Sequence, residues 1–578
     1  MQNYGFRRGL AKDLLVAVFF FSLMEILNIL YPMVLKNLVT EKVTNDAGVL
    51  PGMADFLISA GIVLGMLIII FFVSLYARNR VSVFGAKCRR NARNMLYEKM
   101  SKVPTNVLNE YGSSKFLSCM IEDTSWVKYC NEQYLQCWVY FVVTILGSCV
   151  LIMTLSPIYV LFIVGAVALE VLILFIHCAI INKRLPASVD AYEKSFVATR
   201  ESIAGARDIR ILGKQAERSA EAMRQNKELS KEIFDLDQSK HIFSRSNNII
   251  FGIATFGIII FSALSVTGNN LAEQLVIVNT VLQYITLCTT ATNNIFKLII
   301  NPLTRGRIAY QRIDQFMQLP EEDIDNGITH LDTEFGSSLV MYQVNHRFWN
   351  GRVTIENLSM ELQKGKFIAF CGEAGSGRTT LIKILLRYIE PKAGVVLVNG
   401  VNVREINKQY YRSKLISFCP AYPEFIKGTV RDNIRLFNPD VTDEQILATF
   451  NEVGASNLAV LPSFLDTELS SRSNLPQQVK AFINIVRSIL KPAEFYIFDS
   501  SFINLSDDAV RSVLKKLRAE NKACIFTSIN PLICQNVDEV FFAKPDHTYV
   551  KGTHGWLLAK NQEYASFFMQ DKKTEEDL

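Results

Sequence analysis

Six apolar runs, each about 20 residues long, lie within the first 300 positions of this 578-residue chain. A run of roughly 18 or more apolar residues is long enough to cross the hydrocarbon core of a bilayer as a helix. One large soluble core would not need six such runs, so we expect a six-span membrane domain. The predicted spans are 14–35, 56–77, 134–155, 158–181, 249–266 and 275–300.

Basic residues are concentrated in two long connections between these runs. Ten lysines or arginines lie in 78–131 and thirteen in 182–248, whereas 36–55 has two. Basic loops tend to stay on the cytoplasmic side. We therefore expect a multi-pass protein of the cell membrane with both long connections, both termini and the C-terminal domain in the cytoplasm. The net charge of +6 follows from this bias and requires no nucleic-acid partner.

The second long connection has helical periodicity and no proline over 190–233. This pattern favours membrane helices that extend far into the cytoplasm over a separate folded insert. The eleven cysteines form no CxxC or Cys/His cluster, so we interpret them as reduced thiols that hold no metal.

The sequence pattern changes near Leu339, where short β-rich runs begin to alternate with helices. This alternation predicts an α/β domain with a largely parallel sheet. Pro320 and the acidic residues after it mark a domain boundary. We expect a membrane domain over 1–320, a linker over 321–338 and a second domain over 339–578.

A glycine-rich turn in FIAFCGEAGSGRTTLIKIL, between a predicted strand and a predicted helix, carries the strongest chemical signal. Backbone N–H groups and a helix N-terminus cradle phosphates in this context. The turn fits GxxxxGK[ST] except that Arg378 replaces the lysine, and Thr379 is a candidate Mg²⁺ ligand. The motif alone is also consistent with a glycine turn that binds no ligand. The predicted phosphate-binding residues are Gly372, Glu373, Ala374, Gly375, Ser376, Gly377, Arg378, Thr379 and Thr380.

A second signal is the apolar run FYIFD, which ends at Asp499. This pattern resembles the strand end of an ATPase that holds Mg²⁺ through its aspartate. In such enzymes a glutamate usually follows and positions the attacking water, but here the next residue is Ser500.

Four further segments complete a resemblance that covers nearly the whole chain. They are YEKMSKVPTNVLNEYGSSKFLSCMIEDTSWV (97–127), ESIAGARDIRILGK (201–214), ISFCPAYPEFIKGTVRDNI (416–434) and VKGTHGWLL (550–558). With the six spans they resemble a half-transporter of the ATP-binding cassette (ABC) exporter family. The resemblance implies an all-α, type IV exporter-like membrane domain. An α/β P-loop NTPase cassette with a RecA-like core and an α-helical subdomain would follow it.

The same resemblance implies ATP and Mg²⁺ as cofactors. It places Phe348 or Trp349 where family members stack the adenine on an aromatic ring. Thr379 and Asp499 would hold Mg²⁺ through the nucleotide.

Several positions depart from the family pattern. Ala421 stands at the position of the coupling glutamine, and Ser506 at that of the aspartate in the following loop. Ser500 and Ile529 replace the catalytic glutamate and the switch histidine, so the chain offers no catalytic residue of its own. The signature LSGGQ is replaced by Leu475, Pro476, Gln477 and Gln478, followed by Val479.

These replacements all affect phosphoanhydride hydrolysis. Pro476 removes both the signature hydroxyl and an N–H donor. A positioned general base contributes roughly 10²–10⁴-fold to a rate, so its loss predicts negligible hydrolysis in the chain's own Walker site. Nucleotide binding is a separate matter, because the glycine-rich turn, Arg378, Thr379 and Asp499 are kept.

We therefore expect a degenerate subunit of a heterodimeric ABC exporter, in which a second half-transporter supplies any ATPase activity. It would move a drug, lipid or peptide outward through the membrane lipid. The alternative is a pseudo-transporter that acts as a regulatory or scaffold membrane protein. The chain would contribute its altered signature to the partner's ATP site, so hydrolysis at that site should also be impaired.

Two carboxylates within the predicted spans, Glu25 and Glu170, are candidates for the substrate pathway. Ionisable groups inside a membrane are costly and often line a cavity. Hydrogen bonding between helices is the alternative interpretation.

Overall fold

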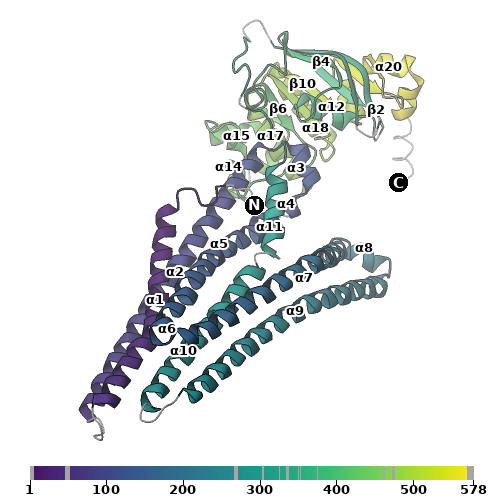
Figure 1. Cartoon of the computed structure of the whole chain (residues 1–578). Coiled ribbons are helices and arrows are strands. Elements are labelled where there is room, and N and C mark those ends of the chain that lie inside the picture. The colour runs from purple at the N-terminus through teal and green to yellow at the C-terminus, as the bar shows by residue number, and fades with distance from the viewer. Residues whose placement is uncertain are drawn as a thin grey trace. The chain divides into compact units, whose positions relative to one another are not determined.

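The computed structural model forms two compact units, each described here by itself. The first comprises Met1–Ser101 and Leu108–Leu319, and the second Lys102–Val107 and Pro320–Leu578. The first is helical and the second contains the strands (Figure 1). The structure describes residues 5–45, 53–265, 271–301, 305–324, 326–332, 337–348, 351, 353–373, 375–459, 463–470 and 475–568.

Long helices build the first unit, and six helical stretches of its described part are long and apolar enough to cross a membrane. The prediction of six spans is therefore confirmed, although Val266 at the end of the fifth predicted span lies outside the described residues. The six stretches are Ala11–Leu38, Leu57–Lys102, Lys115–Leu155, Pro157–Ala204, His241–Leu264 and Gln274–Ile299.

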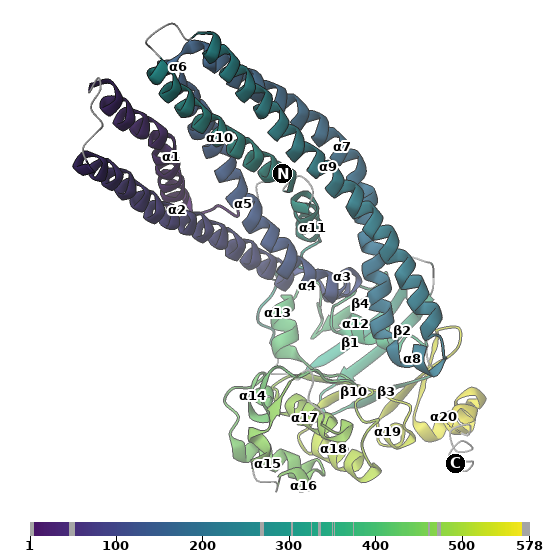
Figure 2. The same cartoon turned by 90° about the horizontal axis from the view of Figure 1, so that it is seen from below.

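The second long connection continues the membrane helices rather than forming an insert, as predicted. α7 (Pro157–Ala204) and α9 (Gln215–Leu264) run side by side and are joined by the short α8 (Ala206–Ile211), a pairing that both views show (Figures 1 and 2). α7 begins with a proline, whose missing N–H would have no partner in a first turn anyway.

Shorter helices connect the remaining spans of this unit. Two π-helical turns interrupt the α-helical geometry: η1 lies between α4 and α5, and η2 between α5 and α6. The other elements are α1 (Ala11–Asn45), α2 (Met53–Lys102), α3 (Thr105–Tyr111), α4 (Ser113–Ser118), η1 (Cys119–Asp123), α5 (Thr124–Val139), η2 (Tyr140–Ile145), α6 (Leu146–Leu155), α10 (Leu271–Asn301) and α11 (Arg307–Met317).

A six-stranded sheet forms the centre of the second unit, in the order β12-β11-β3-β10-β9-β6. All its neighbouring pairs are parallel except β11 and β12, which confirms the predicted α/β domain. The central strands are buried on both faces, which explains their continuous apolar sequences. The strands are β3 (Phe367–Cys371), β6 (Ile416–Cys419), β9 (Phe495–Asp499), β10 (Ala523–Thr527), β11 (Glu539–Ala543) and β12 (Tyr549–Gly552).

A separate four-stranded antiparallel sheet, in the order β2-β1-β4-β5, packs with the core of this unit. The alternation of strands and helices in the sequence predicts the parallel sheet but does not distinguish this second sheet from it. Its strands are β1 (Ser338–Arg347), β2 (Val353–Gln363), β4 (Ala393–Val398) and β5 (Val401–Asn402), and a two-stranded pair joins β7 (Gly428–Thr429) to β8 (Glu468–Leu469).

Local caps fix the start of several helices of the second unit. The Ser506 side chain, for example, accepts a hydrogen bond from the backbone N–H of Ala509 and so caps the helix that follows it. The helices are α12 (Arg378–Leu385), α13 (Lys408–Tyr410), η5 (Tyr411–Leu415), α14 (Val430–Arg435), α15 (Asp443–Glu452), α16 (Ser456–Ala459), η6 (Phe464–Asp466), α17 (Gln477–Leu490), α18 (Asp507–Ala519), α19 (Pro531–Gln535) and α20 (His554–Lys560).

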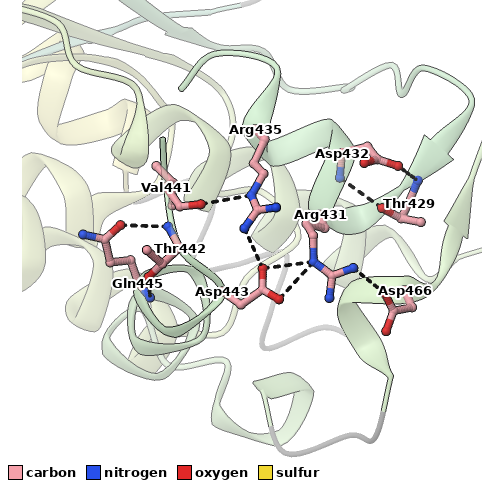
Figure 3. Close-up of polar contacts among 9 residues, drawn as sticks. All are labelled: Thr429, Arg431, Asp432, Arg435, Val441, Thr442, Asp443, Gln445 and Asp466. Atoms are coloured by element: carbon pink, nitrogen blue, oxygen red, sulfur yellow. Dashed lines mark hydrogen bonds and ion pairs between the residues drawn. The ribbon is translucent and has the colours of Figure 1, made fainter. Parts of the chain in front are cut away.

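An ion-pair cluster orders the helical segment between β6 and α17 (Figure 3). Arg431 Nε lies 2.9 Å from Oδ1 and 3.0 Å from Oδ2 of Asp443, and its Nη1 pairs with Asp466. Arg435 Nη2 also donates to Asp443, at 3.0 Å. One guanidinium thus ties the start of α15 to η6, in the segment that leads to the LPQQV sequence.

Candidate nucleotide-binding site

The glycine-rich turn adopts a backbone that requires glycine at its last position. Gly377 has φ +89° and directly precedes α12. A Cβ atom there would lie 2.0 Å from the Thr354 carbonyl oxygen. Gly372 and Gly375 also have positive φ angles, of +150° and +89°. The turn thus runs close to β2 and leads directly into a helix, which is the context in which glycine-rich turns cradle phosphates.

A buried hydroxyl in this turn has no partner. Ser376 is 8% exposed, and its Oγ accepts and donates no hydrogen bond within the described part of the chain. The Ser376 N–H donates to Glu373 O at 3.1 Å. Such an unsatisfied hydroxyl fits a site in which it donates a hydrogen bond to an acceptor of a ligand.

The first turn of α12 presents the other predicted phosphate-binding side chains. Arg378 is half-buried at the first helical position, Thr379 is exposed and Thr380 is buried. Ala374, also predicted for this site, lies outside the described residues. The turn and α12 therefore offer a guanidinium and an exposed hydroxyl at a helix N-terminus, which suits an anion.

Asp499 ends β9 at the same edge of the sheet. Its Oδ1 accepts a hydrogen bond of 2.5 Å from Thr527 Oγ1, and the two residues are paired in the β9–β10 register. Because β10 lies between β3 and β9, a single strand separates Asp499 from the strand that leads into the glycine-rich turn. The structure thus brings Asp499, the turn and Thr379 to one edge, as the sequence predicts.

The residues after Asp499 offer hydroxyls in place of a carboxylate. Ser500 has φ +50°, and its N–H donates to Thr527 O at 3.0 Å and to Thr527 Oγ1 at 3.1 Å. Ser501 Oγ donates to Cys419 O at 2.5 Å. Ile529, two residues beyond β10, is 41% exposed. Neither Ser500 nor Ile529 can act as a proton acceptor at neutral pH in the way that a carboxylate or an imidazole can.

A chain of contacts links Phe348 to the glycine-rich turn. Its ring packs edge-on against the His346 ring, with centroids 5.1 Å apart. His346 Nδ1 is 3.0 Å from Thr354 Oγ1, and the Thr354 carbonyl faces Gly377. Burial, and then the charge of Lys392, lowers the pKa of His346, so this ring is neutral near pH 7. Trp349, the other predicted aromatic, lies outside the described residues.

A cavity of about 410 Å³ adjoins Phe348. The ring is 39% exposed, so it has a free surface for stacking. The cavity is lined by Asn345, His346, Arg347, Phe348, Val353, Ile355, Glu356 and Lys392.

The altered signature lies at the start of α17. Pro476 precedes the helix and makes no side-chain cap, Leu475 is half-buried, and Gln477 and Gln478 are exposed. In the described part of the chain, no hydrogen bond or ion pair joins this segment to the glycine-rich turn.

Three residues that position this site were not predicted from the sequence. Thr527 holds Asp499, Thr354 packs against Gly377, and Tyr549 OH reaches Ser376 O at 3.5 Å. Each contacts a residue on another segment that is distant in the sequence.

The two predicted intramembrane carboxylates have different surroundings. Glu25 on α1 is 5% exposed and accepts a hydrogen bond of 3.0 Å from Thr144 Oγ1. Glu170 on α7 is 1% exposed, and within the described residues neither of its carboxylate oxygens has a hydrogen-bond partner.

Comparisons with known proteins agree with this arrangement. A family model described as ABC transporter transmembrane region matches residues 14–289, and one described as ABC transporter matches residues 355–502. Together they place a membrane region before a cassette in the same polypeptide.

Two curated relatives come from Lactococcus lactis subsp. lactis (strain IL1403). The lactococcin transport/processing ATP-binding protein LcnC-like is 25% identical over 372 residues, which cover 64% of this chain and 51% of that protein. The multidrug resistance ABC transporter ATP-binding and permease protein is 22% identical over 508 residues, covering 86% and 84%. The chain spans about half the length of the first curated relatives it matches.

A solved structure of a bacterial Atm1-family ABC exporter with ATP bound superposes with a TM-score of 0.81. The superposition covers 97% of this chain and 98% of that chain, at 16% sequence identity. This likeness shows that the two share a fold.

Proposed function

The chain belongs to the ABC transporter family, with the membrane region and the cassette of an exporter half-transporter in one polypeptide, and we propose that it is the nucleotide-binding but non-hydrolysing half of a heterodimeric exporter. It is a multi-pass membrane protein with a cytoplasmic cassette. Its N-terminus is proposed to lie on the cytoplasmic side as well, because the basic connections do.

The observation that carries this proposal is the segment after Asp499. Residues 500–506 read SSFINLS and contain no carboxylate. The Ser500 N–H is already bound to Thr527, which fixes this turn. Hydrolysis needs a group that orients the attacking water and stabilises the transferred phosphoryl group. A serine supplies neither a base nor a charge here, so the site is suited to binding alone.

The same edge of the sheet keeps what binding requires. The glycine-rich turn and Ser376 Oγ are proposed to hold phosphate oxygens, with Arg378 neutralising their charge. Thr379 and Asp499 are proposed to hold Mg²⁺, and Phe348 to stack on the adenine. When bound, Mg·ATP would supply the phosphate charges that two facing cassettes share.

The partner is proposed to be a second half-transporter with its own Walker motifs. This chain would contribute LPQQV to that partner's site. Pro476 has no hydroxyl and no N–H to offer a phosphate, so even the partner's site should turn over slowly. ATPase activity of the assembly would therefore depend on residues of the partner.

The cargo is proposed to be a peptide, a drug or a lipid. The relatives named above are a lactococcin transport/processing protein and a multidrug resistance transporter. Their names favour a peptide or an amphipathic drug over other cargo for this chain.

Co-purification from native membranes tests the pairing. The tagged chain is expected to bring down a second half-transporter whose cassette has the glutamate and the histidine that Ser500 and Ile529 replace. Substituting that partner glutamate by glutamine should abolish ATP hydrolysis and transport. A chain that transports when purified alone would contradict the heterodimer.

A second function, a regulatory or scaffold pseudo-transporter, is favoured by one observation. Pro476 and the exposed Gln477 and Gln478 weaken the composite site to which this chain contributes. This function predicts that no half-transporter co-purifies and that substituting Asp499 leaves the cellular phenotype unchanged. A phenotype that disappears with Asp499→Asn supports the exporter instead.

A further inference from the structure

Glu170 differs from Glu25 in how its charge is accommodated. Glu25 receives a hydrogen bond from Thr144, whereas both Glu170 oxygens lack a partner within the described residues although the side chain is 1% exposed. Glu170 also lies near the middle of the predicted span 158–181, about 17 Å from either end of that span at the rise of an α-helix. An unpaired carboxylate at such a depth is costly and needs a partner or a proton.

Contacts among α7, α9 and α10 fix the register in which Glu170 lies. His177 of α7 packs against Phe243 of α9 with ring centroids 5.3 Å apart, and Phe243 stacks on Phe296 of α10 at 3.6 Å. Further along, a Cβ on Gly257 of α9 would lie 2.7 Å from the Phe162 ring of α7. α7 and α9 are therefore antiparallel.

This register brings Glu170 close to Asn247. The pairs 162/257 and 177/243 place Glu170 opposite residues 249–250 of α9, less than one helical turn from Asn247. Asn247 is fully buried and donates through Nδ2 to Thr289 O of α10 at 3.2 Å. Its Oδ1 accepts no hydrogen bond in the described part of the chain.

The acceptors of Glu170 and Asn247 are not satisfied by neighbouring side chains of the described residues. The nearby hydroxyls of Thr289 and Thr292 donate to carbonyl oxygens one turn earlier in their own helix, Ile285 O and Cys288 O. The His177 ring, two helical turns along α7, does not donate to either residue, so two carboxylate oxygens and one amide oxygen have no donor in the described part of the chain. An ammonium or a guanidinium carries several N–H donors and one positive charge, and would satisfy all three.

We infer that Glu170, together with Asn247, binds a cationic group of the transported molecule and so selects amine- or guanidinium-bearing cargo. This inference rests on the proposed export function and specifies its substrate class. Phe243 and Phe296 provide an aromatic surface for the apolar part of such a molecule. Glu170 is closed off in this state. Because its side chain is 1% exposed, a cargo would reach Glu170 only when the helices around it separate.

A matched pair of fluorescent probes tests this inference. Monodansylcadaverine carries a primary amine, and its N-acetyl derivative has the same dansyl group and chain without the charge. Binding of both is measured by dansyl fluorescence with the full-length chain in lipid nanodiscs and without ATP. We expect the amine to bind at least ten times more tightly than its acetylated form.

The Glu170→Gln variant should reduce this preference to about one and leave binding of the acetylated probe unchanged. Glu170→Asp should keep part of the preference because it keeps the charge. Asp190→Asn, which removes an exposed acidic group 64% accessible on the same helix, is the charge-matched control and should keep the full preference.

An unchanged preference in Glu170→Gln, or equal binding of the two probes to the unsubstituted chain, would overturn the inference. A misfolded variant is recognised because it would lose the acetylated probe as well, and Glu170→Asp then decides the outcome. Since no ATP is present, this result is independent of whether the chain hydrolyses nucleotide or needs a partner.

Discussion

Thr527 Oγ1 donates a hydrogen bond of 2.5 Å to Asp499 Oδ1, so that the last residue of β10 holds the last residue of β9. The same threonine receives the Ser500 N–H through its carbonyl oxygen. One residue therefore fixes both the candidate Mg²⁺ ligand and the turn in which the expected glutamate is missing.

Replacing Thr527 by valine keeps the shape and removes the hydroxyl. A typical hydrogen bond contributes about 1 kcal/mol, so we expect Mg·ATP affinity to fall about five-fold because Asp499 is no longer oriented. Thr527→Ser should bind like the unsubstituted chain. Titration with a fluorescent ATP analogue, with and without Mg²⁺, measures the effect. An equal loss in EDTA would show that Thr527 acts on the fold and not on the metal.

Gly377→Ala should abolish nucleotide binding. Its Cβ would meet the Thr354 carbonyl oxygen at 2.0 Å, in a backbone with φ +89°. Gly400→Ala is the matched control, because Gly400 has φ +78° and open space around it. That control should incur only the left-handed strain of about 1–2 kcal/mol. Equal nucleotide affinities of the two variants would contradict the close approach of β2 to the turn.

Arg431→Ala should loosen the helical segment before α17. It leaves the Asp443 and Asp466 carboxylates without their shared guanidinium (Figure 3). We expect faster amide hydrogen exchange over 430–470 and a lower unfolding temperature, with a larger effect at low salt. Arg404→Ala breaks a more exposed pair with Glu390 and should not change exchange in that segment. Unchanged exchange in Arg431→Ala would show that the cluster does not order it.

Lys491 makes stability depend on pH in the alkaline range. Burial, and then the charge of Lys414, lowers the pKa of Lys491 to about 8, although its Nζ donates to Arg412 O and Ile416 O. The unfolded chain, with an ordinary lysine pKa of 10.5, binds the proton more tightly. The contribution of Lys491 to the free energy of unfolding therefore rises as pH increases from about 8 to 10.5.

Comparison with Lys491→Met isolates this contribution. The difference in thermal unfolding midpoint between the unsubstituted chain and the variant should increase in favour of the unsubstituted chain from pH 7.5 to 9.5. A difference that stays constant or shrinks over this range would mean that Lys491 has an ordinary pKa.

Much of the fold follows from local sequence pattern. The six spans follow from run length, and β3, β9 and β10 follow from apolar runs that a parallel sheet buries on both faces. The helix cap of Ser506 is likewise local, because its side chain accepts from the backbone N–H three residues on. These features depend on neighbouring residues and are therefore visible in the sequence.

Features that depend on register between distant segments were not predicted. Thr527 meets Asp499 only because β10 and β9 pair in a particular register. From the sequence, Glu25 and Glu170 were equal candidates for the substrate pathway. In the structure, Thr144 donates a hydrogen bond to Glu25 but not to Glu170. The roles of Ser500, Ile529 and the LPQQV segment rest on family resemblance and stay predictions.

This chain is proposed to bind ATP in its own Walker site without hydrolysing it. The most direct measurement compares Mg·ATP binding with phosphate release for the purified chain in nanodiscs, alongside Asp499→Asn. We predict saturable binding of one nucleotide per chain, weakened by Asp499→Asn, and phosphate release no faster than in that variant. Phosphate release that exceeds the variant's and follows the occupancy of the site would contradict the account.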